Sequence, residues 1–178
     1  MNHKIPLIFV TVVSLTLTLG CSQSPKSPDV KADVERALSQ AGLSKVSVSQ
    51  DRDKGVITLS GDVQTDAEKQ KAETVARSIS NSFVIANQIG VRPSGLESET
   101  KKVDSSLDAA IEKNFEALLV ANRLNKDIKY SAKNGVLTLS GQVNSIKKRA
   151  QVAQLAASVP NVKQVVNELQ IKNVKATS

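Results

Sequence analysis

The spacing of apolar residues divides the chain into alternating helical and extended segments. After Pro28, apolar positions recur three or four residues apart until Gly42, as in a helix with proline in its first turn and glycine after its last. Further on, apolar and polar residues alternate as in strands, and a capping box from Thr65 to Glu68 opens a second helix. The predicted elements are a helix from Pro28 to Ala41, strands at Val46 to Gln50 and Val56 to Ser60, a helix carrying Ala72, Val75, Ala76 and Ile79, and a strand from Phe83 to Val91.

One segment of this pattern occurs twice. Gly55-Val56-Ile57-Thr58-Leu59-Ser60-Gly61 returns with a single conservative change as Gly135-Val136-Leu137-Thr138-Leu139-Ser140-Gly141, an offset of 80 positions that continues without a gap past the segment. Such a repeat indicates one small domain in tandem. We therefore predict an α+β fold of two α-β-β-α-β domains, each a three-stranded mixed sheet packed against two helices. The predicted boundaries are 28–92 for the first domain, 93–102 for a linker, 103–172 for the second domain and 173–178 for a polar tail.

The repeated segment and the residues after it carry a family resemblance. In both copies the segment is followed by a valine (Val63 or Val143) and by a late strand that contains an asparagine (Asn87 or Asn167). Two such α-β-β-α-β units resemble the BON-domain family, and more narrowly its dual-BON periplasmic lipoproteins. The resemblance implies a non-enzymatic role in the bacterial cell envelope, with binding to phospholipid surfaces as the usual proposal.

The N-terminal segment is predicted to direct export. Lys4 and the amino terminus precede a mostly apolar run from Ile5 to Leu19. This run is shorter than the roughly 20 residues that a membrane-spanning helix needs, and it is typical of the core of a signal peptide. We therefore predict a signal peptide over residues 1–20.

Cys21, the only cysteine of the chain, follows directly. Its position resembles the acylated cysteine of a bacterial lipobox, although Thr18 stands where that motif usually has leucine. Ser22 in place of aspartate implies transport to the outer membrane, so we expect a lipid-anchored protein on the periplasmic side, with residues 21–27 as a tether. Ordinary secretion with Cys21 as a free thiol is the alternative.

The residue types that usually carry catalysis are nearly absent. The only histidine is His3, inside the predicted signal peptide, and Cys21 is expected to be acylated. Without imidazole or thiolate, the usual general base and the commonest zinc ligands are missing. We predict no enzymatic activity, no cofactor and no metal site. Because they recur in both copies, Asn87 and Asn167 are interpreted as structural hydrogen-bonding residues.

Charge distinguishes the two copies. Residues 29–92 contain nine Lys or Arg and nine Asp or Glu, whereas residues 101–178 contain thirteen and six, a net charge of +7. Basic domains often bind nucleic acid, but an exported lipoprotein has little access to it and the chain has few aromatic residues. Anionic phospholipid headgroups are the expected partner, since each nearby Lys or Arg contributes about 1 kcal/mol before screening. A merely solubilising basic surface is the alternative.

The first helix of each copy differs as well. With the 80-residue offset, four polar residues of the first copy align with apolar residues of the second, of which Phe115 and Leu119 share one helix face. We predict an apolar patch ringed by cations, which suits shallow insertion at an anionic interface. Packing against the first domain explains the same residues equally well. The aligned residues are Glu35, Ser39, Gln40 and Ser44 in the first copy and Phe115, Leu119, Val120 and Leu124 in the second.

A further candidate is the run Lys147-Lys148-Arg149 in the first turn of the second copy's last helix. Cations at this end oppose the helix dipole, so the run is either an anion site or neutral drift. The leading hypothesis is an envelope lipoprotein whose basic second domain binds anionic phospholipid. A protein-interaction or stress-adaptor module that binds an envelope protein is the alternative. The predicted phospholipid-binding residues are Lys113, Phe115, Leu119, Val120, Arg123, Lys126, Lys147, Lys148 and Arg149.

Overall fold

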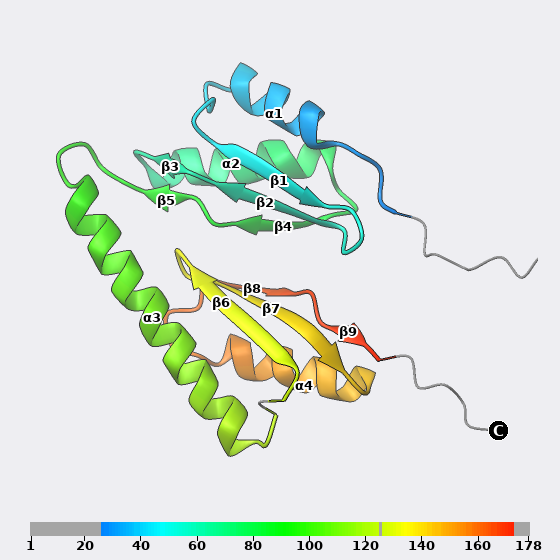
Figure 1. The fold of residues 1–178 in the computed structure, drawn as a ribbon. Coiled ribbons are helices and arrows are strands. Elements are labelled where there is room, and N and C mark those ends of the chain that lie inside the picture. Colours follow the sequence, from blue (N-terminus) through cyan, green and yellow to red (C-terminus); the bar gives the residue numbers. More distant parts are fainter. Residues whose placement is uncertain (1–25, 125, 173–178) are drawn as a thin grey trace, which may run out of the picture.

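The computed structural model describes residues 26–124 and 126–172, which form two domains of the same architecture (Figure 1). The predicted signal peptide, Cys21 and the predicted tail lie outside the described residues. The first domain contains α1 (Lys31–Gln40), β1 (Ser47–Asp51), β2 (Val56–Ser60), β3 (Asp62–Val63), α2 (Asp66–Ile79), β4 (Val84–Asn87) and β5 (Gly90–Val91). The second contains α3 (Glu97–Ala121), β6 (Ile128–Lys133), β7 (Val136–Val143), α4 (Ile146–Ala157), β8 (Gln164–Asn167) and β9 (Gln170–Ile171).

Both sheets have the predicted mixed topology. In the first domain β1 pairs antiparallel with β2, and β2 pairs parallel with β4. In the second, β6 pairs antiparallel with β7, and β7 pairs parallel with β8. Short parallel pairs, β3 with β5 and β7 with β9, extend each sheet past the repeated glycines. These pairings confirm the predicted fold of two tandem α+β domains.

Two helices begin at other residues than the pattern predicts. Ser27, which precedes the predicted first helix, pairs its N–H with the carbonyl of Arg52 in the β1–β2 turn. Helix α1 starts later, where the side-chain oxygen of Gln50 accepts from the N–H groups of Val30 and Lys31 at 3.1 Å each. Helix α3 starts earlier, at Glu97, so the end of the predicted linker 93–102 is its first turns.

Each domain has its own core on the face of the sheet that its helices cover. In the first domain, α1 contributes Val34 and Leu38, and these pack with Ile57 and Leu59 of β2. The second core has the same construction and is also largely aliphatic. Its fully buried side chains are Ile111, Phe115, Leu119, Leu137, Leu139, Val152, Ala156 and Leu169.

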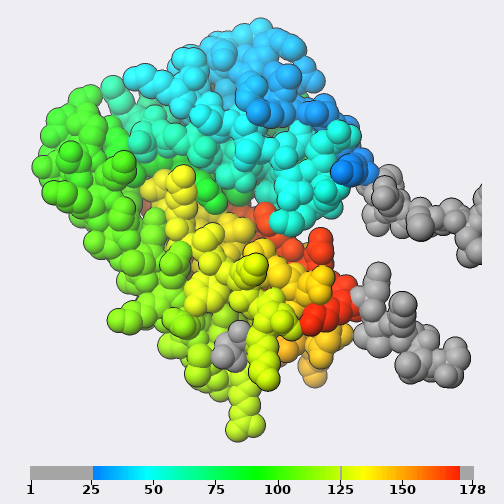
Figure 2. Space-filling view, viewed as in Figure 1, coloured from blue at the N-terminus to red at the C-terminus, as the bar shows by residue number. Residues whose placement is uncertain are grey.

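The two domains meet through equivalent surfaces. Val56 and Ala86 of the first domain form a buried cluster with Val136 and Val166 of the second, and each pair is related by 80 positions. The β1–β2 turn of the first domain reaches the end of β8, and the β6–β7 turn of the second domain reaches the end of β4 (Figure 2). The junction is therefore approximately two-fold symmetric.

Polar contacts at the junction follow the same symmetry in part. Lys54 Nζ donates to the carboxylate of Glu168 at 2.7 Å, and Asn134 Nδ2 donates to the carbonyl of Gln88 at 2.7 Å. The side chain of Gln164 adds a contact that has no counterpart, because valine stands at the equivalent position 84. Its amide donates to the carbonyl of Ile85 at 2.6 Å and accepts from the N–H of Asn87 at 3.2 Å, along the free edge of β4.

Candidate functional site

Two of the predicted phospholipid-binding residues are core residues. Phe115 is 0% exposed and Leu119 is 1% exposed, and both pack in the interior of the second domain. The ring of Phe115 meets Tyr130 of β6 edge to face, with 5.2 Å between the ring centroids. Both predicted roles for this pair, insertion into a membrane and packing against the first domain, are therefore wrong.

The error arises because the 80-residue offset does not hold before the β-hairpin. The turn after β1 spans residues 52–55, whereas the turn after β6 is only Asn134-Gly135. The second copy compensates only in part, with a connection between its first helix and first strand that is one residue longer. At the helix ends, Leu43 N–H bonds to Leu38, and Leu124 N–H bonds to Leu119, which is an offset of 81. Phe115 and Leu119 thus occupy the positions of the core residues Val34 and Leu38.

The other predicted residues of α3 lie on the surface. Lys113, Arg123 and Lys126 are exposed, and Val120 is an exposed apolar side chain near the end of the helix. Helix α3 packs against α4, whose first residue, Ile146, is 75% exposed. Helix α4 and the C-terminal end of α3 lie on the side of the second domain that faces away from the first (Figure 1).

Three cations from different parts of the second domain act on one exposed carboxylate, that of Asp127. Lys172 Nζ donates to Asp127 at 2.7 Å, and this hydrogen bond lowers the pKa of the Asp127 carboxyl. Lys148 and Lys126 lower the pKa of Asp127 further through their charges, so both are near it. The structure thus brings together Lys126 and Lys148, which are distant in sequence, beside an exposed loop.

The first turn of α4 lacks the acidic residues that stabilise the equivalent turn of α2. In α2, Thr65 and Glu68 form the predicted capping box. In α4, Ser145 Oγ accepts from the N–H of Lys148 at 3.2 Å. The second bond of a capping box is missing, because a lysine side chain cannot accept from the backbone N–H of Ser145. Lys147 and Arg149 are exposed and Lys148 is half-buried; Arg149 also donates to the carbonyl of Asn167 at 3.4 Å.

The repeated asparagines have a structural role, as predicted. Asn87 Oδ1 accepts from the N–H of Ile89 at 3.4 Å, and Asn167 Oδ1 accepts from the N–H of Leu169 at 3.2 Å. Each bond fixes the bend between the two short strands that close its domain. In the first domain Asn87 also donates to the carbonyl of Lys69 and to Glu73.

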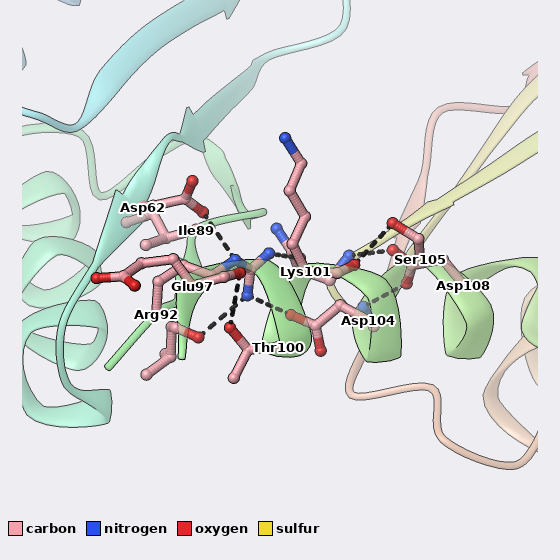
Figure 3. A network of polar contacts seen from close by, with 12 residues as sticks. Asp62, Ile89, Arg92, Glu97, Thr100, Lys101, Asp104, Ser105 and Asp108 are labelled. Atoms are coloured by element: carbon pink, nitrogen blue, oxygen red, sulfur yellow. Dashed lines mark hydrogen bonds and ion pairs between the residues drawn. The ribbon is translucent and has the colours of Figure 1, made fainter. Parts of the chain in front are cut away.

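Arg92, which the sequence pattern does not single out, is a buried cation at the domain junction. It lies between Asp62 of the first domain and Asp104 of α3 (Figure 3). Its Nη1 is 2.5 Å from Asp104, and its Nη2 donates to Asn134 Oδ1 at 3.3 Å. Only 8% of Arg92 is exposed. This arginine therefore ties the end of the first domain to both the first helix and the hairpin of the second.

The described part of the chain contains neither a membrane-spanning helix nor a metal-binding cluster. Over residues 26–124 and 126–172, none of the helices has the length and apolar character that crossing a membrane requires. Over the same residues, no group of three or more His, Cys, Asp or Glu is placed to hold a metal ion.

Comparison with known proteins gives one family and two relatives. The sequence profile of the BON domain matches residues 26–93 and again residues 107–173. The osmotically-inducible protein Y of Escherichia coli K12 is 27% identical over 146 residues, covering 80% of this chain and 71% of that protein. An uncharacterized protein in the gshII 5′ region of Anaplasma centrale is 30% identical over 123 residues, covering 68% of this chain and 79% of that protein.

Two solved structures of CdsD, a structural protein of the type III secretion system of Chlamydia trachomatis, also align. The C-terminal domain of CdsD gives a TM-score of 0.32 at 18% identity and covers 80% of this chain. The second structure gives 0.31 at 15% identity and covers 78%. The alignments span 65% and 59% of the two CdsD chains, which is less than two thirds of their length.

Proposed function

Since the chain belongs to the BON-domain family, we propose that it is a non-enzymatic lipoprotein of the bacterial cell envelope whose second domain binds anionic phospholipid membranes. The observation that carries this proposal is the exposed surface at the end of α3 and the start of α4, here called the distal surface. It combines apolar side chains with cations and faces away from the first domain. Its residues are Lys113, Val120, Arg123, Lys126, Ile146, Lys147, the half-buried Lys148 and Arg149.

Charge and apolar contact have separate roles in this proposal. Each cation close to an anionic bilayer contributes about 1 kcal/mol before screening. Val120 and Ile146, which are 55% and 75% exposed, supply the shallow apolar contact. Phe115 and Leu119 support this surface from beneath as core residues and do not contact lipid.

The lipid anchor is proposed at Cys21, which lies outside the described residues. Acylation there would hold the protein on the periplasmic side of the envelope, at the outer membrane. The acyl chains would hold the protein in one membrane, and contact of the basic surface with lipid would then orient or localise the second domain. By analogy with the osmotically-inducible relative, we place the protein in envelope integrity or stress tolerance.

Co-sedimentation with vesicles tests the proposed membrane contact. The chain from Ser22 onward, without acyl chains, should sediment with vesicles that contain phosphatidylglycerol but not with phosphatidylcholine alone. Salt should release it, because screening weakens exposed charge interactions. Lys147→Glu with Lys148→Glu should reduce binding roughly tenfold or more, given the contribution of each charge.

A matched charge reversal elsewhere controls for net charge. Lys45→Glu with Lys102→Glu changes the net charge equally, but both residues are exposed outside the distal surface. This control should bind nearly as well as the unmodified chain. Equal losses in both double variants would contradict a localised membrane contact.

A protein partner is the second candidate, and one observation favours it. Leu96, just before α3, and Val103 and Leu107 in its N-terminal half are 53%, 58% and 39% exposed. Exposed apolar surface of this kind is typical of protein contacts. The absence of vesicle binding, together with a single crosslinked envelope protein lost on Val103→Asp, would support this function over lipid binding.

A further inference from the structure

A polar cavity of about 280 Å³ lies between the two domains, on the side of α2. It is separate from the distal surface, and its walls come from both domains. An adjoining cavity of about 340 Å³ shares three of its residues, Lys69, Asn134 and Lys163. The residues that line the polar cavity are Lys69, Glu73, Arg77, Asn87, Asn134, Val136, Lys163 and Gln164.

The charged side chains of this cavity are unbalanced toward the positive. Lys69, Arg77 and Lys163 face a single carboxylate, that of Glu73. Glu73 is already engaged, since Arg77 donates to one oxygen at 2.8 and 3.0 Å and Asn87 donates to the other at 3.0 Å. Burial acts to raise the pKa of Glu73, but these hydrogen bonds outweigh it and lower the pKa below the usual value. Glu73 therefore stays ionised, and its hydrogen bonds go to Arg77 and Asn87 and not to the two lysines.

Lys69 is held in the wall of the cavity by the backbone. Its Nζ donates to the carbonyl of Ile89 at 2.8 Å, and an ammonium group has two further donors. Burial, and then the charge of Lys163, lower the pKa of Lys69, although Asp66, Asp104 and Glu73 oppose the shift. The half-buried Lys69 and the exposed Lys163 thus lie close enough for their charges to interact. A bound anion would relieve their repulsion.

The amide side chains around the cavity have fixed positions. Gln164 is bound at both ends to the edge of β4, and Asn134 is bound to Gln88 and Arg92. Their hydrogen bonds hold the two domains at a constant separation across the cavity. The cavity is thus formed in advance, as small-ligand sites usually are.

Two of the three cations of the cavity, Arg77 and Lys163, have no cation at the equivalent position of the other copy, whereas Lys69 corresponds to Arg149. Beyond the hairpin the 80-residue offset holds, so Glu73 and Arg77 correspond to Ala153 and Ala157 of α4. Lys163 in turn corresponds to Phe83, a core residue of the first domain. The fold common to both domains does not require these charges. They form a cluster only because the two domains meet here.

We propose that this cavity binds an oxyanion of the phosphate class, with Lys69 and Lys163 on either side of it and Arg77 at its edge. Lysine binds phosphate as a point charge, and Arg77, whose Nε and Nη2 donate to Glu73, would turn its Nη1 toward the ligand. The adjoining cavity limits the size of the ligand. Asp66, Glu99 and Asp104 line that space and disfavour an anion that extends into it. The ligand is therefore small, with its negative charge confined to one group.

Titration with inorganic phosphate, followed by ¹H–¹⁵N correlation spectra, tests this site on the chain from Ser22 onward. At constant ionic strength, phosphate should give saturable shifts of the amides of Lys69, Asn87 and Gln164, and sodium chloride should not. Lys69→Gln and Lys163→Gln should each weaken binding about tenfold. Lys102→Gln, an exposed lysine outside the cavity, should leave the affinity within about twofold.

Two further experiments distinguish a soluble phosphomonoester from a lipid headgroup as the ligand. Glycerol 3-phosphate should compete with phosphate if the ligand is a soluble phosphomonoester. If a lipid headgroup is the ligand, phosphatidylglycerol vesicles should broaden the same amides in the Lys147→Glu, Lys148→Glu variant, whose distal surface is disabled, and adding Lys163→Gln to that variant should abolish this effect. Either result supports an oxyanion site, and neither depends on the distal surface. The Lys147→Glu, Lys148→Glu variant, which tests the membrane contact, should bind phosphate as the unmodified chain does.

Three results would overturn the proposal. The first is a shift that grows linearly with phosphate and is reproduced by chloride. The second is unchanged affinity in Lys163→Gln; because this side chain is exposed, the variant tests the site without disturbing the core. The third is a phosphate affinity that does not depend on pH. Because the pKa of Lys69 is lowered, Lys69 should lose its proton at a pH below the usual lysine pKa, and the affinity should fall there. Affinity that stays constant through that range would exclude Lys69.

Discussion

At the scale of single residues, the repeated glycines are required by a close approach of two backbones. Gly61 has φ of +109° and Gly141 has φ of +106°. A Cβ on Gly61 would lie 2.6 Å from the carbonyl oxygen of Lys45, and one on Gly141 would collide with the carbonyl of Asp127. The repeated glycines Gly61 and Gly141 therefore permit the bend at the end of β2 and in β7, and they are not needed for a ligand.

Replacement of Gly61 by alanine tests this role. Gly61→Ala should lower the free energy of unfolding by about 3 kcal/mol, since it combines left-handed strain with a steric overlap. Gly42 is the matched control, because its φ is +80° but a Cβ at this position would have no atom within 4 Å. Gly42→Ala should cost only about 1 kcal/mol. Urea denaturation measures both values, and equal losses would contradict the steric argument.

At the scale of elements, periodicity and turn signals are sufficient for the type and order of the helices and long strands. These are local properties, so the capping box of Thr65 and the hairpin signal Asn134-Gly135 could be read directly. The register of Phe115 and Leu119 could not. It depends on the lengths of the hairpin turn and of the connection between the first helix and the first strand. The repeat alone does not reveal that the second copy has a shorter turn and a longer connection.

Some features of the candidate site could also be predicted from the sequence, and others could not. The exposure of Lys113, Arg123 and Lys147 follows from the helical pattern, because charged residues occupy the solvent face. The contributions of Arg92 and Lys163 do not follow from any pattern in their own domain. Their surroundings are created by the contact between the domains, which local periodicity does not encode.

Helix α4 offers a prediction that links stability to function. Lys148→Glu would place glutamate at the position of Glu68 in α2 and complete a capping box with Ser145. The variant should be more stable by about 0.5–1 kcal/mol, from the second cap hydrogen bond and the favourable dipole interaction. It should also bind anionic vesicles less strongly. Thermal or urea unfolding measures the first effect, and co-sedimentation measures the second.

Lys147→Glu separates the two effects. It removes the same charge from the same turn, but position 147 is not the third residue of the helix and cannot close the capping box. Its gain in stability should be smaller, whereas its loss of vesicle binding should be similar. If Lys148→Glu destabilises the protein, Lys148 contributes to the fold through Asp127 and the capping argument is wrong.

At the scale of the whole molecule, the junction is built from two equivalent surfaces that have acquired different polar groups. The apolar contacts of Val56 and Val136 retain the symmetry. The polar contacts break it, since Gln164 and Arg92 act in one direction only. This asymmetry leaves one side of the junction with the cationic cavity. A two-domain chain can hold such a site because each copy keeps its own core and only the junction has diverged.

The ion pair between Lys54 and Glu168 makes the stability of this junction depend on pH. The hydrogen bond from Lys54 to Glu168, opposed by burial, raises the pKa of Lys54 above its usual 10.5. A raised lysine pKa stabilises the folded state while the lysine is protonated, and this contribution is lost as the pH rises through the folded-state pKa.

Glu168→Gln should therefore lower the free energy of unfolding by about 1 kcal/mol at neutral pH. Because Lys54 loses its proton at high pH, the difference between the variant and the unmodified chain should shrink as the pH rises above 10.5. Urea denaturation at several pH values measures this difference. Asp127→Asn is the control, because its partner Lys172 is 46% exposed and the pair does not join the two domains. A difference for Glu168→Gln that is independent of pH would mean that Glu168 acts by packing and not through the charge of Lys54.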